Sequence, residues 1–398
     1  MQTEFDAIVV GAGIVGLATA RRLQALRPHW RLAVLDKEPA VGAHQSGHNS
    51  GVIHAGVYYP PGSLKAAFCR RGAAATLRFC ADHGIAHRQC GKLIVATERS
   101  ELTRLRALAE RAAANGLRGQ MLDAAAIAER EPSVRGVGAL YVPETGIADY
   151  PAMCAKLAEL FVAAGGTLIC GATVDGIDER SDGVSVESTL GTWRGGRLVV
   201  CAGLQADRLA RLAGLAIDFA ILPFRGDYYR LPAARGRLVS TLIYPVPDPR
   251  LPFLGVHLTV TTAGAITVGP TAMLALAREA YRKWGFDWRD CVTLAGYPGT
   301  WRLLSRFPRA GALEFLHAVS RRLYLRAAQR YCPQLDIADL ADHECGIRAQ
   351  AVNRRGELIN DFLIEQTPRS VHVCNAPSPA ATAAFPIAET IAERLLAS

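Results

Sequence analysis

The clearest pattern of apolar and polar residues lies near the amino terminus. The run FDAIVV, from Phe5 to Val10, predicts a buried strand, and RLAVLD, from Arg31 to Asp36, predicts a second one. Between them, GAGIVG is followed by LATARRLQALR, which has the apolar spacing and the composition of a helix. This part of the chain therefore predicts a strand, a glycine-rich turn, a helix and a strand, in that order.

Similar patterns return after a long interruption. Residues 149–166 predict a helix, 167–177 a strand, and 195–214 a strand that turns into a helix at Ala202 and Gly203. Residues 275–335 predict several helices, and a last helix over 383–398 follows a short strand. Strands and helices that alternate at both ends of the chain indicate an α/β fold.

Length and composition set limits on this fold. A chain of 398 residues exceeds the usual size of one core, so two domains are expected, and 50% hydrophobic with 20% charged residues is typical of a globular protein. The ten cysteines form no C-x-x-C pair and no metal-like spacing, which favours reduced thiols in a cytosolic protein and predicts no metal site. No apolar run reaches the roughly 18 residues that a spanning helix needs, so no membrane crossing is predicted.

The charge of the chain narrows the choice of partners only in part. A formal net charge of +9 suits an anionic substrate, an anionic lipid surface or nucleic acid, and by itself does not choose among them. The sequence contains no recognisable nucleic-acid module, internal repeat or low-complexity linker. We therefore expect no nucleic-acid partner.

The glycine-rich turn supplies the first chemical signal. Gly11 permits the tight turn, Gly13 lets the backbone approach a pyrophosphate, and Gly16 allows close packing of helix on strand. The helix that follows presents unpaired N–H groups and a partial positive charge to phosphates. Asp36, twenty residues after Gly16, is placed to accept a hydrogen bond from a ribose hydroxyl. The pattern predicts a site for NAD or FAD.

The continuation of the chain separates these two cofactors. In a typical NAD enzyme strands and helices would go on alternating, whereas here the second strand runs into SGHNSGVIHAGVYYPPGSLKA, from Ser46 to Ala66, which has neither period. The strands and helices predicted over 149–214 then complete the same domain. One cofactor domain assembled from separated pieces is typical of two-domain flavoenzymes.

Several motifs together resemble a known family. The glycine-rich turn with Asp36, the VVCAG turn and VCNAPSPAATAAFPIA look like the D-amino-acid-oxidase-type FAD superfamily. Within it, the L-2-hydroxyglutarate dehydrogenase/oxidase family is closely resembled by HQSGHNSGVIHAGVYYPPGSLKA, PFRGDYYRL, LIYPVPDPRLPFLGVHLT, GIRAQAV and NAPSPAAT. The resemblance runs from about Phe5 to Leu396. It implies oxidation of L-2-hydroxyglutarate to 2-oxoglutarate by hydride transfer to flavin N5.

The resemblance also implies a domain organisation. The fold is expected to be a Rossmann-like FAD-binding domain with an inserted mixed-sheet α+β substrate domain, of the D-amino-acid-oxidase/glutathione-reductase-2-like kind. We expect the discontinuous FAD-binding domain to comprise residues 1–80, 150–215 and 345–398. The substrate domain is then expected over 81–149 and 216–344, with a basic helical segment near 275–335.

FAD is the implied cofactor, and the resemblance implies its binding residues. The segment after the second strand passes beneath the flavin, where glycines let the chain lie flat against a large ring. Amides near NAPSPAAT would stabilise negative charge at flavin N1–C2=O. The expected FAD-binding residues are Gly11, Gly13, Ile14, Gly16, Asp36, Lys37, Ser46, Gly47, Asn49, Ser50, Gly51, Val174, Ala202, Gly203, Asn375, Ala376, Pro377, Ala380, Ala381 and Thr382. Covalent attachment through a His or Cys near this region is left open.

The implied reaction needs a base for the hydroxyl proton of the substrate. Histidine fits this role because its reference pKa of about 6.5 is tuned by modest changes of environment. The candidates are His257, in the strand-like run FLGVHLTV, and His54, which the resemblance places near the reactive face of the flavin. We prefer His257, with a buried histidine paired to a backbone carbonyl as the alternative interpretation.

A five-carbon diacid needs two cationic anchors, because a buried carboxylate without partners is strongly unfavourable. Arg225 in PFRGDYYRL and Arg348 in GIRAQAV are expected to be these anchors, since a guanidinium binds a carboxylate through two hydrogen bonds. Tyr58, Tyr228 and Tyr244 are expected to add hydroxyl donors.

The resemblance implies that the electron acceptor is a membrane quinone or oxygen. The basic, aromatic-bearing helices over 275–335 suit the headgroup region of a membrane, and an ordinary solvated helical face explains them equally. The expected location is the cytoplasm, either free or peripheral on the inner face of the cytoplasmic membrane. Two rival functions remain at this point: an amino-acid or N-methyl-amine oxidase on the same fold, and a flavin-binding module without chemistry.

Overall fold

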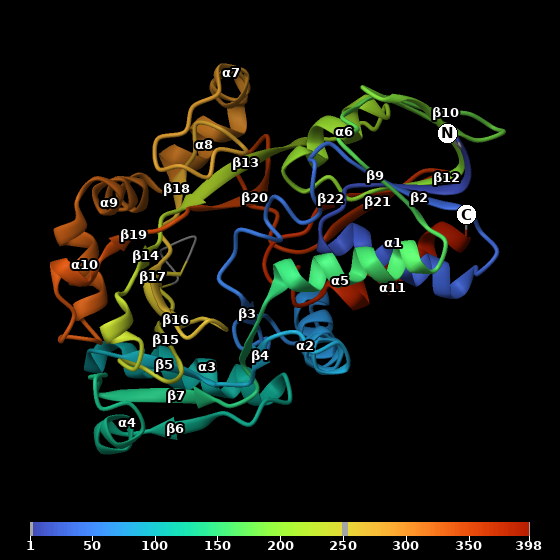
Figure 1. Ribbon diagram of the computed structural model, residues 1–398. Helices are drawn as coiled ribbons and strands as arrows, with labels where there is room; N and C mark the ends of the chain where they lie inside the picture. The colour runs from blue at the N-terminus through green and yellow to red at the C-terminus, as the bar shows by residue number, and fades with distance from the viewer. Residues whose placement is uncertain (1–2, 249–253, 398) are drawn as a thin grey trace.

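The computed structural model describes residues 3–248 and 254–397 and contains two large sheets, one in each half of the molecule (Figure 1). The first sheet follows the path β10-β11-β12-β1-β2-β9, and β22 joins it beside β12 and pairs with β21. Its strands are β1 (Glu4–Val10), β2 (Leu32–Asp36), β9 (Thr167–Cys170), β10 (Val174–Glu179), β11 (Val184–Ser188), β12 (Gly191–Val200), β21 (Leu363–Gln366) and β22 (Ser370–Asn375). Segments from the beginning, middle and end of the chain thus share one sheet.

The centre of this sheet is parallel and buried. β1 pairs in parallel with both β2 and β12, and its residues from Ala7 to Val10 are buried. The helices α1 (Ile14–Leu26), α5 (Tyr150–Ala163) and α11 (Ala384–Ala397) lie side by side in the same half (Figure 1), and α2 (Leu64–Asp82) packs on α11. Burial on both faces explains why these strands read as continuous apolar runs.

The second large sheet is mixed. It follows the path β19-β14-β17-β16-β15-β5-β7-β6, in which only the pair β15 and β5 is parallel. Its strands are β5 (Lys92–Ala96), β6 (Gln120–Leu122), β7 (Gly138–Val142), β14 (Tyr229–Arg230), β15 (Leu242–Pro245), β16 (His257–Val260), β17 (Ile266–Gly269) and β19 (Ala341–Asp342). The helices α3 (Leu102–Ala114) and α4 (Ala124–Arg130) pack on its β7 side.

Two small sheets join the halves. The long strands β13 (Phe219–Gly226) and β20 (Gly346–Asn353) form an antiparallel ribbon that continues to β18 (Met273–Leu274), and β8 (Gly146–Ala148) lies between β3 (Val52–Ile53) and β4 (His87–Arg88). The remaining helices are α6 (Ala206–Leu212), α7 (Trp288–Gly296), α8 (Pro298–Arg306), α9 (Pro308–Val319) and α10 (Arg321–Gln329), with 3₁₀ turns η1 (Arg99–Glu101), η2 (Gly203–Gln205), η3 (Ala233–Arg235) and η4 (Ile337–Asp339).

The structure differs from the sequence pattern in two places. The single strand expected over 167–177 is two strands, because the chain turns at Gly171, where φ is +79°. The expected helices over 275–335 begin only at Trp288, since residues 275–287 form turns and a bridge beside Leu276. The expected division into two domains and its boundaries stay a prediction.

Candidate active site

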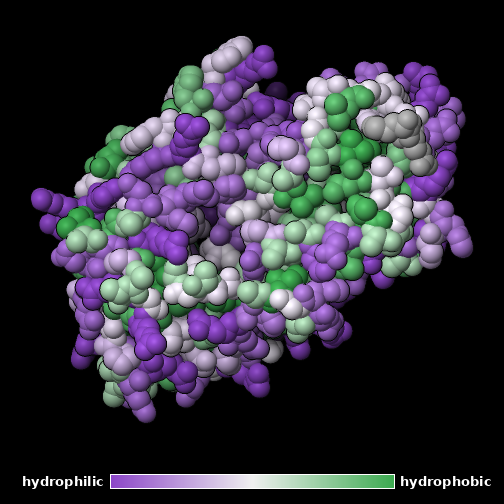
Figure 2. Space-filling view, in the orientation of Figure 1, coloured by the Kyte–Doolittle hydropathy of each residue, from purple (hydrophilic) through white to green (hydrophobic). Residues whose placement is uncertain are grey.

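A cavity of about 1150 Å³ lies between the two halves, where the surface is hollowed in Figure 2. It runs from the glycine-rich turn before α1 to His54 and His257. Single small-molecule pockets usually measure about 300–1,000 Å³. The volume therefore leaves room for a dinucleotide cofactor together with a small substrate.

The glycine-rich turn fits a pyrophosphate. Gly11 has a φ of +105°, and a Cβ there would lie 2.3 Å from the carbonyl oxygen of Cys201, while a Cβ at Gly16 would lie 1.9 Å from the carbonyl oxygen of Gly11. α1 has no acidic residue in its first turn, and Ile14 and Val15 line the cavity there. The positive end of the helix dipole is thus open to an anionic group.

Asp36 ends β2 at the same end of the cavity. Its Oδ2 accepts a hydrogen bond from the amide of Ala12 at 2.6 Å, and its Oδ1 accepts one from the amide of Glu38 at 2.9 Å. An ionised carboxylate offers about four lone-pair sites. Asp36 therefore holds the turn against the strand end and keeps capacity to accept from a ribose hydroxyl.

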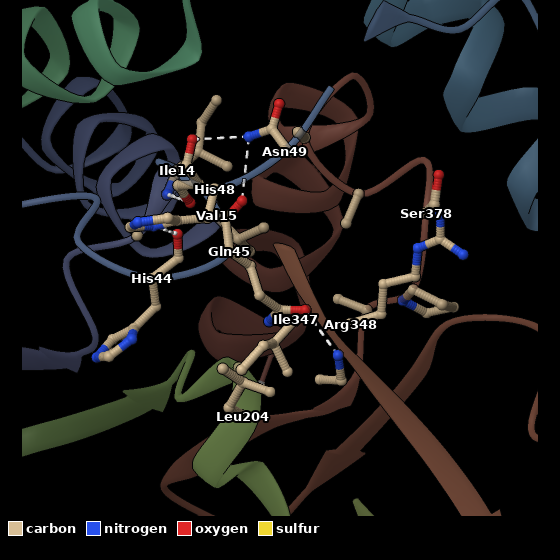
Figure 3. A pocket seen from close by; sticks show the side chains of 18 of the residues that line it. Ile14, Val15, His44, Gln45, His48, Asn49, Leu204, Ile347, Arg348 and Ser378 are labelled. Atoms are coloured by element: carbon tan, nitrogen blue, oxygen red, sulfur yellow. Dashed lines mark hydrogen bonds between the residues drawn. The ribbon is translucent and has the colours of Figure 1, made fainter. Parts of the chain in front are cut away.

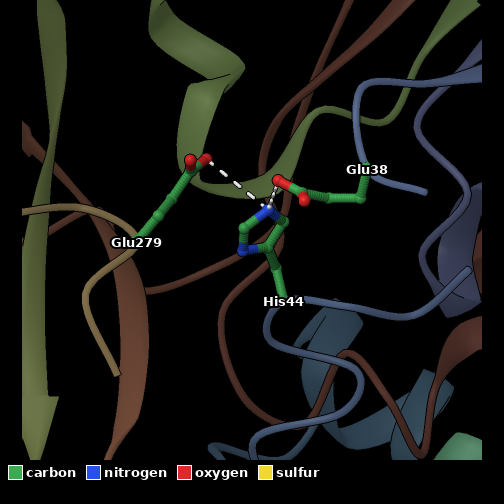
Figure 4. A group of neighbouring side chains, drawn as sticks. All are labelled: Glu38, His44 and Glu279. Carbon is green, nitrogen blue, oxygen red and sulfur yellow. Dashed lines mark hydrogen bonds and ion pairs between the residues drawn. The ribbon is translucent and has the colours of Figure 1, made fainter. Parts of the chain in front are cut away.

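An ion-pair cluster, three of whose side chains Figure 4 shows, includes Lys37, His44 and Glu279, which line the cavity. His44 Nε2 lies 2.9 Å from Glu38 Oε1 and 3.8 Å from Glu279 Oε1. Lys37 donates to both carboxylates, at 2.8 Å to Glu279, and its hydrogen bond lowers the pKa of Glu38. The ammonium of Lys37 already bridges the two acids, so the three groups form a salt-bridge network around a lysine.

The loop after β2 braces the cavity wall (Figure 3). Asn49 Nδ2 donates to the carbonyl oxygens of Gln45 and Ser46 at 3.0 and 2.8 Å, and Ser46 Oγ accepts from the amide of Ile14 at 3.0 Å. Gln45 Oε1 accepts from the amide of Ala349 on β20 at 2.8 Å. The loop therefore ties α1 to the β13–β20 ribbon, and the side chain of Asn49 is used within the loop.

Eighteen of the twenty expected FAD-binding residues line this cavity, and their contact with FAD stays a prediction. The two others, Gly47 and Gly51, shape the loop from behind: a Cβ at Gly47 would lie 2.6 Å from the carbonyl oxygen of Gly42, and Gly51 has a φ of +69°. At the carboxyl-terminal edge, Thr382 Oγ1 accepts from the amide of His54 at 3.1 Å. The last segment of the chain is thus fastened to the strand that leads into the site.

His257 is buried at the far end of the cavity. Its Nδ1 lies 2.9 Å from the carbonyl oxygen of Gly255, which can only accept, so Nδ1 carries the proton and Nε2 keeps a lone pair. Burial, and after it the charges of Lys92 and Arg348, lower the pKa of His257 to about 3, against the hydrogen bond to Gly255. A neutral imidazole with a free Nε2 is a proton acceptor.

His54 lines the same end. Its carbonyl oxygen accepts from the thiol of Cys69 at 3.0 Å, and its amide is held by Thr382. Burial, then the positive charges of Lys92 and His257, hold the pKa of His54 well below its usual value. The structure therefore brings both candidate bases into one cavity, close enough for their charges to interact.

Of the two arginines predicted to bind the substrate, only one lines the main cavity. Arg348 leaves β20 into the cavity (Figure 3) and is hydrogen-bonded to Tyr228. Arg225 does not line this cavity: its Nε donates to Asp227 Oδ1 at 2.7 Å, and its side chain is only 3% exposed. A buried guanidinium needs a carboxylate partner, and Asp227 two residues further on supplies it. The structure thus does not bring Arg225 to the substrate end.

Lys65 lies at that end instead. It belongs to the first turn of α2, lines the cavity, and has its ammonium 5.5 Å from the ring centroid of Tyr59. Burial lowers the pKa of Lys65 to about 8. Together with Arg348 it gives this part of the cavity two cations.

Three predicted tyrosines, Tyr58, Tyr228 and Tyr244, also line this end. The hydroxyl of Tyr58 is buried and has no hydrogen-bond partner among the described residues, and burial raises its pKa well above the usual value. A buried orphan hydroxyl is unfavourable unless a ligand satisfies it. Its position fits a polar substrate.

The sequence analysis missed Lys65, Tyr59 and the buried Lys92 of β5. Lys92 opens the run KLIVA, all of whose residues are buried. A charged residue at the head of an otherwise apolar strand was the available signal, because a buried lysine needs a reason. Lys65 carried no such signal, since a lysine in the first turn of a polar-faced helix is ordinary.

Comparison with known proteins gives consistent matches. A family model described as FAD dependent oxidoreductase matches residues 6–394. The L-2-hydroxyglutarate dehydrogenase of Escherichia coli strain K12 is 47% identical over 392 residues, which cover 98% of this chain and 93% of that protein. The human mitochondrial L-2-hydroxyglutarate dehydrogenase is 41% identical over 411 residues, with coverage of 99% and 89%.

Solved structures agree in fold. An FAD-bound L-alpha-glycerophosphate oxidase from Mycoplasma pneumoniae superposes with a TM-score of 0.81 at 23% identity, covering 100% of this chain and 95% of that one. A glycine oxidase from Geobacillus kaustophilus gives a TM-score of 0.72 at 19% identity, with coverage of 100% and 96%. At these identities the likeness concerns the arrangement of the chain.

Proposed function

The chain belongs to the family of FAD dependent oxidoreductases, and from this premise we propose that it oxidises L-2-hydroxyglutarate to 2-oxoglutarate. The observation that carries the substrate is the 47% identity, over nearly the whole length of both chains, to a dehydrogenase named for it. The cavity supports the same choice, because two cations and an unpaired hydroxyl lie beside two neutral histidines.

FAD is the cofactor, and the residues at the α1 end fit it. The turn leaves no space for a side chain at Gly11 or Gly16, the first residues of α1 line the cavity, and Asp36 retains acceptor capacity. When bound, FAD supplies the acceptor for the hydride that leaves C2 of the substrate. The Ser46 loop and the Asn375–Thr382 segment would hold its flavin half.

His257 takes the hydroxyl proton at Nε2. Its Nδ1–H is engaged by Gly255, and its ring stacks on that of Tyr244, with centroids 3.8 Å apart, so the imidazole has one orientation. Loss of this proton and of the C2 hydride leaves the 2-oxo acid. His54 is the alternative base, and it lies within the same cavity.

Arg348 and Lys65 bind the two carboxylates, with Tyr58, Tyr228 and Tyr244 as hydroxyl donors. The guanidinium of Arg348 binds one carboxylate through two hydrogen bonds, and the ammonium of Lys65 binds the other as a single positive charge. This pair replaces the predicted pair of arginines, because Arg225 is already neutralised by Asp227. An amine substrate is disfavoured, since its ammonium would meet these two cations.

We further propose that electrons leave to a quinone at an anionic membrane surface. Five aromatic residues are more than half exposed, and we call them the aromatic surface: Trp284, Phe286, Trp288, Trp301 and Phe315. Exposed arginines stand among them, including Arg302, Arg306 and Arg309, and Figure 2 shows apolar and hydrophilic groups interspersed over these helices. Aromatic rings with basic side chains suit lipid headgroups.

A second cavity supports this route. It measures about 370 Å³, opens among residues of α8 and α9, and is lined mostly by apolar side chains. Phe224 and Arg225 of β13 line it, while the next residue, Gly226, lines the main cavity. One strand therefore borders both spaces. None of the helices in the described part of the chain is long and apolar enough to cross a membrane.

The test of the substrate is an anaerobic absorbance titration of the FAD-loaded protein with L-2-hydroxyglutarate, its D enantiomer, L-lactate and amino acids. Only L-2-hydroxyglutarate is expected to bleach the flavin absorbance band. Bleaching by an amine, with the hydroxy acid silent, would replace this proposal by an amine oxidase.

The test of the membrane route is sedimentation with anionic and with zwitterionic vesicles. Replacing Trp284, Trp288 and Phe315 by Ser is expected to abolish binding to anionic vesicles and to leave bleaching by the substrate intact. The control replaces two exposed apolar residues elsewhere, Val162 and Leu190, by Ser. Equal vesicle binding by both variants would mean an ordinary solvated face and leave oxygen as the acceptor.

A further inference from the structure

Lys92 is a buried lysine that the proposed reaction does not yet use. It is the first residue of β5, pairs with Leu242 of β15 and Val142 of β7, and is 1% exposed. Its ammonium lies 4.0 Å from the ring centroid of Tyr244 and 5.3 Å from that of Tyr58. Both rings line the main cavity and Lys92 itself does not, so the charge lies behind the cavity wall, near enough to act on His54 and His257.

This ammonium has no acidic partner. Among the described residues no carboxylate lies within 4 Å of it. The thiols of Cys69 and Cys90 lie near, but burial raises the pKa of both, so that they stay protonated and supply no negative charge. Attraction to two aromatic faces offsets part of the cost of burying a cation. A buried charge without a counter-ion is otherwise unfavourable, so its presence at this position indicates a functional role.

The neighbours of Lys92 indicate that function. Charge interactions link Lys92 to His54, which follows β3, to His257 of β16, and to the thiols of Cys69 on α2 and of Cys90 just before β5. The rings of Tyr58 and Tyr244 face its ammonium, and the charges of Lys65 on α2 and Arg348 on β20 act on His54 in the same group. None of these is a carboxylate. A positive charge on Lys92 opposes a positive charge on either imidazole.

We propose that Lys92 is a positioning residue that makes proton transfer depend on the second carboxylate of the substrate. Burial already disfavours protonation of His54 and His257 in the free enzyme, and the excess of positive charge that Lys92 makes with Lys65 and Arg348 adds to this effect. A diacid brings two negative charges and cancels this excess, so that His257 can then accept the hydroxyl proton. The inference rests on the proposed function.

This arrangement gives selectivity in the chemical step. A 2-hydroxy acid with a single carboxylate would cancel only half as much charge as the diacid. It would therefore bind with its hydroxyl beside a base that still resists protonation. The expected result is a lower kcat and not only a higher KM for the monoacid, because the missing carboxylate acts on the transition state.

The direct measurement is the titration of His257 by NMR in FAD-loaded protein labelled at histidine Cε1, with its signal assigned by its loss in His257→Gln. The wild type is expected to show a higher pKa for His257 when 2-oxoglutarate is bound than when it is absent. In Lys92→Met the free-enzyme pKa is expected to rise by about one unit, a tenfold change in the protonation ratio. An unchanged value in both comparisons would overturn the proposal.

The kinetic measurement is the pH dependence of substrate-driven flavin bleaching. In Lys92→Met the acid limb of kcat/KM is expected at higher pH, since the base is protonated more easily. The kcat preference for L-2-hydroxyglutarate over L-2-hydroxybutyrate is expected to fall about tenfold. Below about pH 7, where Lys92 is itself protonated, Lys92→Arg keeps the charge and should keep both wild-type values. Lys156→Met, on the surface of α5, is the matched control.

These outcomes separate the two hypotheses. If L-2-hydroxyglutarate fails to bleach the wild type, the proposed function fails, whatever Lys92 does. A second outcome is that L-2-hydroxyglutarate bleaches the wild-type flavin while Lys92→Met keeps the wild-type acid limb of kcat/KM and the wild-type preference for the diacid. In that case only the role of Lys92 is overturned. A general loss of rate in Lys92→Met and Lys92→Arg alike, without a shift of the limb, would mean a packing role.

Discussion

The imidazole of His257 stacks on the ring of Tyr244, with centroids 3.8 Å apart and planes inclined by 23°. The same tyrosine ring faces the ammonium of Lys92. One side chain therefore contacts both the candidate base and the cation that opposes its protonation. Because Tyr244 and His257 come from adjacent antiparallel strands, β15 and β16, this relationship is set by the register of the sheet.

His257→Gln is expected to lower the rate of flavin bleaching by L-2-hydroxyglutarate by about 10²–10⁴-fold, the usual contribution of a general base. His87→Gln is the matched control, since His87 also has its Nδ1 on a backbone carbonyl but is exposed outside the cavity. Stopped-flow absorbance under anaerobic conditions measures both. A larger loss in His54→Gln than in His257→Gln would transfer the role of base to His54.

Arg348→Met and Lys65→Met are each expected to raise the KM for L-2-hydroxyglutarate by roughly 10–100-fold, because each leaves one carboxylate without its partner in a buried site. The same changes should affect a monocarboxylate substrate unequally, since only one anchor meets its single carboxylate. Arg118→Met, at an exposed ion pair with Glu144, is the control. Unchanged KM values in both variants would place the anchors elsewhere.

Arg225→Met is expected to destabilise the protein by about 3–5 kcal/mol, because it leaves the buried carboxylate of Asp227 unpaired. The double variant with Asp227→Leu should recover much of that loss. Urea unfolding measures both, and the KM of the folded Arg225→Met protein should stay near the wild-type value. A raised KM at unchanged stability would return Arg225 to the substrate site.

Lys92→Met is expected to stabilise the protein at pH 7 by on the order of 1–4 kcal/mol, since burial lowers the pKa of Lys92 to about 7 from its model-compound value of 10.5. The folded state binds this proton less tightly than the unfolded state does. The cost of burying the charge is therefore present in full below the folded pKa and is relieved as pH rises from about 7 toward 10.5.

The measurement for Lys92 is urea unfolding at several pH values. The stability gain of Lys92→Met over the wild type should shrink between pH 7 and pH 10, and Lys156→Met should show no such trend. A variant that is less stable than the wild type at pH 7 would show that Lys92 contributes packing that outweighs the cost of its charge.

Gly16→Ala is expected to abolish FAD retention, because the new Cβ would lie 1.9 Å from the carbonyl oxygen of Gly11 and displace the turn. Gly311→Ala on α9, where a Cβ meets nothing within 4 Å, is the control and should keep its FAD and gain up to about 1 kcal/mol of stability. The ratio of flavin to protein absorbance after gel filtration measures FAD retention in both variants. Full FAD content in Gly16→Ala would contradict the role given to this turn.

The cofactor half of the site could be predicted from the sequence because its signals are local. The turn, helix and strand around Gly11 and Asp36 are contiguous, and each residue type has one physical reason to be there. The motifs after β2 and near the carboxyl end carried the family resemblance. The family and FAD are confirmed by the matches over residues 6–394, and the predicted fold class is confirmed with them.

The substrate half was predicted less completely, because its residues come from strands whose register the sequence does not display. Arg225 and Arg348 sit in equally suggestive motifs, yet only one of them reaches the cavity, since Asp227 neutralises the other. The choice between them depended on which neighbour each guanidinium meets in the folded chain.

The sequence by itself determined the dinucleotide turn, the fold class and the family, because these follow from residue types at short, fixed spacings. Only the tertiary structure decided that Lys65 and not Arg225 lines the cavity with Arg348. It also decided that, within the described part of the chain, Lys92 faces the rings of Tyr58 and Tyr244 without a carboxylate beside its ammonium. The reason is physical: the charge state of a buried group depends on its burial and on the charges around it, and both arise from segments that meet only when the chain has folded.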